Sequence, residues 1–165
     1  MASKTQICNL ALAQLGASRL TSITDNTTEA KLCNTFFDDI VDEVLIESPW
    51  SRSIKRVALV KTTNTPAFGF DSEFQLPTDV LRVIEINNES LGNIPFAIEF
   101  DKLNIDASAV SIKYISRLTN TGDFGVALTR AIVARLAAEL AYPITGSPQI
   151  AQSLYERFEF ILIRC

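Results

Sequence analysis

Four carboxylates in the expected second helix form the sequence's best candidate for chemistry. They are spaced so that pairs of them lie one helical turn apart on adjoining faces: Asp38, Asp39, Asp42 and Glu43. Paired carboxylates can hold Mg²⁺ or share a proton. However, they alternate with apolar residues as the solvated face of an amphipathic helix does, so a solvent-facing role is favoured. Beyond that role, lining a channel is more attractive than catalysis, because like charge keeps DNA from adhering as it slides.

A short basic stretch follows this helix, with Arg52, Lys55 and Arg56 close to Trp50. An aromatic ring beside cations can offer a stacking platform to single-stranded nucleic acid. The stretch is short, and we favour an anchoring role in which Trp50 enters the core and the cations meet acidic neighbours. In an assembly of several copies, these cations could contact the acidic face of the second helix on the next subunit.

The last expected helix carries more apolar surface than one buried face can use. Phe158 and Phe160 are two residues apart, about 200° around a helix, so both cannot face the same interior. One of them must point outward or into a partner. The helix end, which includes Ile161 and Ile163, is apolar nearly all round, and this pattern predicts burial at an interface with a partner or another subunit.

Several kinds of active site are missing from the sequence. The chain has no histidine, which removes the commonest general base, and no glycine-rich phosphate loop. Its cysteines, Cys8, Cys33 and Cys165, form no CxxC pair and are expected to be free thiols in a reducing cytosol, with the first two in the core. We therefore expect no enzyme activity, catalytic residue, cofactor or metal site.

The overall charge and hydropathy exclude further classes. The net charge is −4, whereas a sequence-independent grip on nucleic acid needs a surplus of Lys and Arg. The amino-terminal segment lacks the basic region of a signal peptide, and no run approaches 18 unbroken apolar residues. We expect a protein that is neither exported nor embedded in a membrane.

The 165 residues, 47% of them hydrophobic, are expected to form one α+β domain with its own core. Apolar residues at helical spacing predict four helices, at about 3–16, 27–47, 123–141 and 148–163. Ser3 is expected to cap the first helix and Asn26 the second, while Pro143 and Gly146 should end the third. The third helix carries an alanine-rich face around Ala134 and Ala138 that should pack closely on another helix.

Between the second and third helices, about 55–118, the sequence predicts a small, mostly antiparallel β region. Short runs typical of strands span 57–60, 73–76, 80–86, 96–100 and 110–115. The separators, rich in Thr, Asn, Gly and Pro, are expected to be loops at 62–66, 77–79, 87–95 and 101–108. The β region is thus expected to be an insertion between two helical halves that pack together.

Three segments together resemble a known family. Residues 7–16 read ICNLALAQLG and precede a helix with an EAK start, an FDDI centre and a PW end; residues 74–83 read FQLPTDVLRV, and residues 135–147 read RLAAELAYPITGS. In this order they resemble the tail tubular protein A-like head-to-tail adaptors of short-tailed bacteriophages. The resemblance covers nearly the whole chain.

The resemblance implies a helical bundle with an inserted β region, assembled as a ring of typically twelve copies. Such a ring would bind the phage portal protein on one side and the tail nozzle protein on the other, in the virion neck, after assembly in the host cytoplasm. DNA would pass along its axis without specific binding.

Three alternatives remain open at this stage, and one of them is a regulatory binding module that works as a monomer or dimer. A head-completion connector of a long-tailed phage would have a comparable helical core. A metal-dependent phosphodiesterase built on the helix-two carboxylates would belong to a different class altogether.

Overall fold

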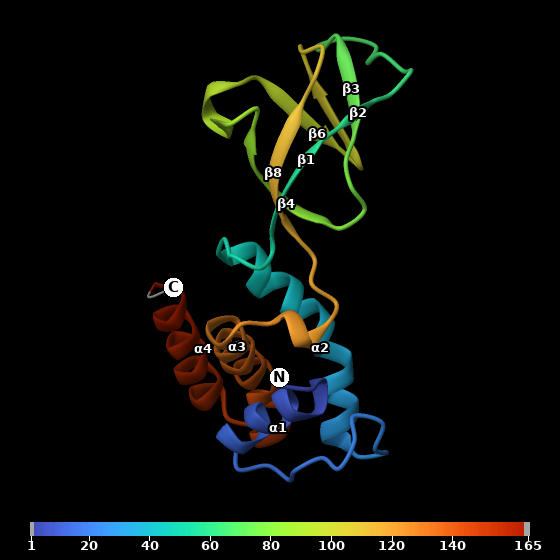
Figure 1. Ribbon diagram of the computed structural model, residues 1–165. Helices are drawn as coiled ribbons and strands as arrows, with labels where there is room; N and C mark the ends of the chain where they lie inside the picture. The colour runs from blue at the N-terminus through green and yellow to red at the C-terminus, as the bar shows by residue number, and fades with distance from the viewer. Residues whose placement is uncertain (1, 164–165) are drawn as a thin grey trace. The chain divides into compact units, whose positions relative to one another are not determined.

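The computed structural model describes residues 2–163. It confirms the α+β class, with four helices and two small antiparallel four-stranded sheets between the second and third helices (Figure 1). The chain divides into two compact units. We call them the helical unit, made of the chain up to Arg52 and from Leu118 onward, and the β unit, Ser53–Arg117. The β unit closely matches the insertion expected from the sequence.

The first two helices begin at side-chain caps. In α1, Lys4–Gln14, the Ser3 hydroxyl accepts a hydrogen bond from the Gln6 amide at 3.2 Å, as predicted. In α2, Thr28–Glu47, the prediction of Asn26 as the cap is wrong by one residue, since the Thr27 hydroxyl accepts from the Ala30 amide. Both residue types can cap a helix, so the residue type alone does not separate these two adjacent positions.

The third helix lies closer to the carboxyl terminus than the predicted 123–141, since it begins three residues later and ends four residues later. It runs over Val126–Thr145, as α3, and continues through Pro143 instead of ending there. Pro143 lies in the last turn, where a missing amide removes a single intrahelical hydrogen bond. Gly146 ends the helix in the left-handed conformation, with φ of 67°, and its amide donates to the Tyr142 carbonyl at 2.9 Å. The chain then enters α4, Pro148–Ile163.

The alanine-rich face of α3 is buried, as predicted. Ala134 and Ala138 are 2% and 6% exposed, and α3 contacts α4, α2 and α1. Small side chains let helix axes approach closely, and α4 lies alongside α3 in Figure 1. Among the described residues, no helix has the length and hydropathy needed to cross a membrane.

Eight strands form the β unit, in two sheets. The first sheet has the order β1-β8-β4-β5, with strands Ile54–Ala58, Ser111–Ser116, Val80–Ile86 and Glu89–Ser90. The second has the order β2-β3-β7-β6, with strands Val60–Lys61, Ser72–Gln75, Lys102–Ile105 and Phe96–Glu99. Short 3-10 turns occupy Leu91–Asn93 and Thr121–Asp123, the second of them in the helical unit.

Two predicted loops contain strands, since the short β5 lies within 87–95 and β7 within 101–108. The strand β7 pairs with both β3 and β6 and buries Leu103 and Ile105. The run is short, and the turn before it, Phe100-Asp101, contains neither Gly nor Asn, the strongest signals of a two-residue hairpin turn. With β7 the β region becomes two sheets. Their shared core is made of Phe74, Leu76, Val83, Ile86, Leu103, Ile105, Val110, Ile112 and Tyr114.

Candidate interaction surfaces

The predicted acidic face of α2 is partly neutralised within the helical unit. The Asp38 side chain is 82% exposed, and its Oδ1 lies 3.3 Å from the Lys4 ammonium. Asp39 is exposed and Asp42 is half-buried. Glu43 accepts a hydrogen bond from the Arg135 guanidinium at 2.8 Å. The four carboxylates therefore do not act as one uniform surface.

The side chain of Arg135 on α3 contacts residues of α2, α3 and α4. From α3 it binds Glu43 of α2 and Glu139 of its own helix, the latter at 2.7 Å, and its guanidinium stacks 5.5 Å from the Tyr155 ring of α4. Burial lowers the pKa of Arg135, but the hydrogen bonds to the two carboxylates outweigh it, so the pKa is raised. Glu43 is thereby committed to the packing of the helical unit.

The geometry of these carboxylates bears on metal binding. No group of three or more His, Cys, Asp or Glu side chains in residues 2–163 is arranged to hold a metal ion.

The basic stretch does not form a joint platform with its aromatic neighbour. Trp50 is buried, as predicted, and its indole nitrogen donates to the Val44 carbonyl at 2.8 Å. Arg52 belongs to the helical unit, whereas Lys55 and Arg56 are successive residues of β1 and point to opposite faces of their sheet. Both Arg52 and Arg56 are exposed.

Lys55 meets an acidic neighbour, as predicted, within a polar cluster whose other members the sequence analysis did not identify. Its ammonium lies 2.7 Å from Asp79, whose other oxygen accepts from the Tyr114 hydroxyl at 3.1 Å. The hydrogen bond from Lys55, helped by that from Tyr114, lowers the pKa of Asp79. Burial and the bond to Asp79 raise the pKa of Tyr114 to about 12. The signal was present, because Asp79 closes the Leu-Pro-Thr-Asp turn that carries the family resemblance.

The carboxyl-terminal helix faces two environments, as predicted. Phe158 is 2% exposed and Phe160 is 54% exposed, while Ile161 is half-buried and Ile163 is exposed. This confirms that the two phenylalanines cannot share one interior.

Phe160 and Ile161 line an open groove of about 740 Å³ between α1, α3 and α4. Its apolar lining comes from Leu10, Ala127, Val133, Ala134, Phe160 and Ile161. The described residues that line it also include Arg130 and Arg157, and no carboxylate. Sequence reasoning missed Leu10 and the two arginines, because only the packing of three helices brings them together.

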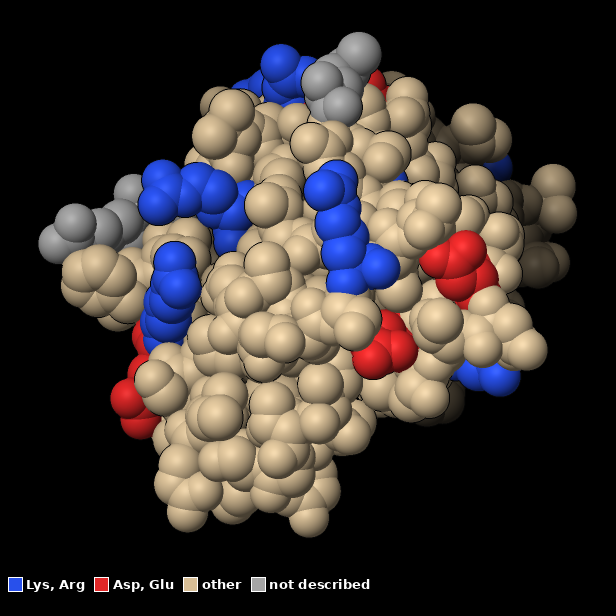
Figure 2. Space-filling view, turned by 90° about the horizontal axis from the view of Figure 1, so that it is seen from below, with Lys and Arg blue, Asp and Glu red and all other residues tan. Residues whose placement is uncertain are grey.

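Charge is thinly spread over the face of the molecule drawn in Figure 2. Uncharged side chains cover most of that face, and Lys and Arg side chains stand apart from one another. The described part of this face thus presents no continuous basic track of the kind that holds nucleic acid.

Cys8 and Cys33 are buried free thiols, as predicted. A hydrogen bond between the two thiols, together with burial, raises the pKa of Cys8 well above its ordinary value. Cys8 is therefore a poor nucleophile in the folded chain. The third predicted free cysteine, Cys165, lies outside the described residues.

A scan against protein-family models finds no model that matches the chain, and a search of curated proteins finds no matching relative.

Proposed function

We propose that the chain is a structural subunit of a phage head-to-tail adaptor ring, which bridges the portal to the tail nozzle and forms part of the DNA conduit. The observation that carries the proposal is the fold: a four-helix unit interrupted by a β insertion between its second and third helices. This is the arrangement that the three family-like segments imply.

Residues of the three family-like segments have structural roles in this fold. This supports treating the three segments as parts of one sequence motif. Trp50, after the Pro49 that follows α2, anchors its indole to the Val44 carbonyl. Asp79, at the end of the Leu-Pro-Thr-Asp turn, joins β1 to β8 through Lys55 and Tyr114. Motif residues of this kind hold elements in place, as a scaffold protein requires.

The net negative charge fits a conduit through which DNA slides better than it fits a protein that binds nucleic acid. The net charge is −4, and exposed carboxylates such as Asp38 and Asp39 repel a phosphate backbone. The phosphodiesterase alternative draws no support from the helix-two carboxylates, because Glu43 is bound by Arg135 and the described residues form no metal-binding group.

The proposal is tested by mixing the full chain with the portal protein of the same phage. We expect negative-stain images to show rings seated on the portal, and mass measurement to give about as many copies as the portal has subunits. The tail nozzle protein should then bind only to the portal that carries this ring. A chain that stays monomeric and never forms a ring on the portal contradicts the proposal.

A further inference from the structure

Phe100 is unfavourable at its position for two reasons, its backbone conformation and the exposure of its side chain to solvent. It lies in the two-residue turn between β6 and β7, with a φ of 57°, and its side chain is fully exposed to solvent. Turns of this kind favour Gly or Asn where φ is positive, because a Cβ atom crowds the backbone there. A large aromatic residue in this conformation is uncommon. Because its ring is exposed to solvent, no burial of apolar surface within the chain offsets the cost of this backbone conformation.

Another turn of the same unit follows the ordinary rule. Between β4 and β5, Asn87 and Asn88 have φ of 51° and 65°, and asparagine tolerates the left-handed region. At both of these turn positions the chain therefore has asparagine, a residue type that tolerates positive φ. Backbone strain that is retained without local benefit points to a role outside the chain.

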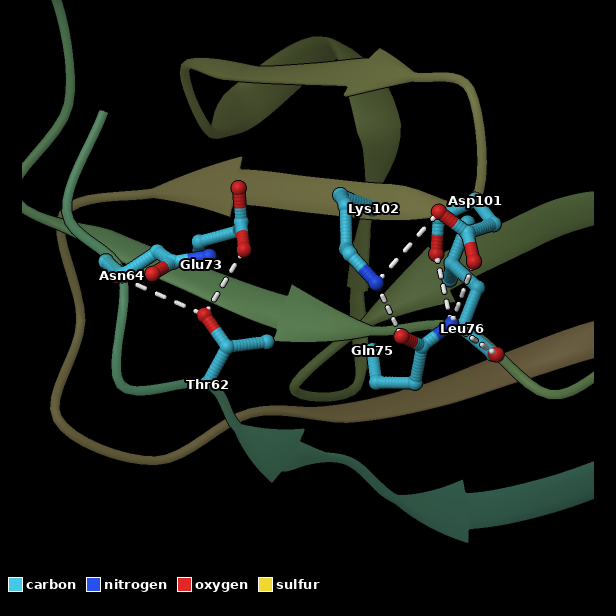
Figure 3. A network of polar contacts seen from close by, with 7 residues as sticks. All are labelled: Thr62, Asn64, Glu73, Gln75, Leu76, Asp101 and Lys102. Atoms are coloured by element: carbon cyan, nitrogen blue, oxygen red, sulfur yellow. Dashed lines mark hydrogen bonds and ion pairs between the residues drawn. The ribbon is translucent and has the colours of Figure 1, made fainter. Parts of the chain in front are cut away.

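Asp101, the residue after Phe100, is held by several polar contacts (Figure 3). The carbonyl of Asp101 accepts from the Leu76 amide at 3.0 Å and from the Gln75 side chain at 3.1 Å. The Asp101 carboxylate accepts from the same Gln75 amide group at 3.0 Å and pairs with Lys102 at 3.4 Å. A tip anchored in this way presents its aromatic ring with little loss of conformational entropy on binding.

The tip is acidic on both sides of the ring. Glu99 and Asp101 flank Phe100 and are exposed, and Lys102 offsets part of their charge. The partner that fits such a tip has an apolar recess bordered by cations. The groove between α1, α3 and α4 has this character, with apolar walls, Arg130 and Arg157, and no carboxylate among its described lining residues.

We propose that the Phe100 tip of one copy inserts into the α1, α3 and α4 groove of a second copy of this chain. Two different faces meet in such a contact, so it is heterologous, and repetition of one rotation closes it into a ring. Phe100 would bury against Leu10, Val133 and Phe160, while Arg130 and Arg157 would face Glu99 and Asp101. The inference rests on the proposed function, and it names the contact by which neighbouring subunits would hold each other.

Phe100→Asn is the direct test, because asparagine suits the turn and removes the ring. We expect the chain to stay folded, with thermal stability unchanged or raised, and its self-association to weaken at least about tenfold, as loss of an aromatic anchor does. Phe68→Asn is the matched control, since Phe68 is 89% exposed in the same unit but has no acidic neighbour directly beside it in sequence. Association is measured by sedimentation velocity over a concentration series, with and without the portal.

Charge reversal tests the groove side. Arg130→Glu should weaken association, whereas Lys31→Glu, at an exposed cation on α2, should not. Glu99→Arg combined with Arg130→Glu should restore it in part. A mixture of Phe100→Asn chains and Arg130→Glu chains should form dimers and nothing longer, because each pair retains one intact tip and one intact groove.

The outcomes separate this contact from the adaptor proposal. Rings on the portal that are equally stable with Phe100→Asn and Phe68→Asn overturn the tip contact and leave the adaptor proposal standing. Association that needs both Phe100 and Arg130, but yields no ring on the portal, supports the contact and overturns the adaptor proposal. A chain that is monomeric alone and with the portal overturns both. Binding to phosphatidylcholine vesicles that is lost in Phe100→Asn would also overturn the tip contact. The aromatic side chain of Phe100 would then bind a lipid surface instead of a second copy of the chain.

Discussion

Asp79 lies between a cation and a phenol, and the pKa values of Asp79 and Tyr114 shift in opposite directions. Lys55 and Tyr114 both donate to the Asp79 carboxylate, at 2.7 Å and 3.1 Å. The carboxylate is stabilised in its charged form, and its pKa is lowered, so its contribution to stability is present at neutral pH and is lost as the pH falls through the folded-state pKa. The pKa of Tyr114 is raised, because burial disfavours the charged phenolate and the Asp79 carboxylate stabilises the protonated phenol.

The first prediction concerns Tyr114. Its pKa of about 12 means that folded protein keeps this phenol neutral above the ordinary tyrosine pKa of about 10. The stability it contributes is complete below about pH 10 and is lost as the pH rises through about 12. In absorbance titration, Asp79→Asn should lower the highest tyrosine pKa, and Tyr114→Phe should remove that transition. An unchanged highest pKa in Asp79→Asn contradicts the cluster.

At the scale of the element, α3 is the helix that contacts each of the other three helices of the helical unit. Its small residues let three other helices pack against it, and Arg135 on its flank joins α2 and α4 through Glu43 and Tyr155. Close packing leaves no room for a larger side chain and no water for a charge.

The second prediction therefore concerns the alanine face. Ala137→Glu is expected to lower the free energy of unfolding by at least about 3 kcal/mol, the scale of an uncompensated buried charge, or to prevent folding, because Ala137 is 0% exposed. Ala134→Glu should cost less, because Ala134 lines the open groove and a longer side chain there can reach solvent. Ala13→Glu is the control, since Ala13 is exposed on α1. Urea unfolding followed by circular dichroism measures the change, and normal stability of Ala137→Glu would show that the helices do not pack closely there.

At the scale of the whole molecule, each of the two units has its own buried core. The β unit is held by its nine-residue apolar cluster, and the helical unit by side chains such as Leu136 and Leu140 of α3, both fully buried. Trp50 belongs to the helical unit and is the chain's single tryptophan, so its fluorescence reports on that unit.

The third prediction uses this separation. Ile112→Ala should destabilise the β unit by about 2–5 kcal/mol, through lost burial and a residual cavity, with little change in the Trp50 transition. Leu136→Ala should shift the Trp50 transition by a similar free energy. Denaturant unfolding is followed by Trp50 fluorescence and by tyrosine absorbance in a Tyr142→Phe, Tyr155→Phe background, in which Tyr114 of the β unit is the single remaining tyrosine. Equal shifts of both probes in both variants would mean that the chain unfolds as one cooperative body.

The residue types along the chain determined the class of fold and most of its elements. Apolar residues at helical spacing located all four helices, and Ser3 marked the start of α1. These signals are local, since a helix depends on neighbours three and four residues away. Burial of the two cysteines and the opposite orientations of Phe158 and Phe160 follow from the same periodicity.

Only the tertiary structure decided the features that depend on distant segments. The strand β7 forms because β3 and β6 lie on either side of it, although its turn contains neither Gly nor Asn. The pairing of Glu43 with Arg135 joins residues 92 positions apart, so no spacing rule could find it. The groove beside Phe160 likewise needs α1, α3 and α4 together, because Leu10 of α1 precedes the β insertion whereas its two arginines and its other apolar lining residues follow it.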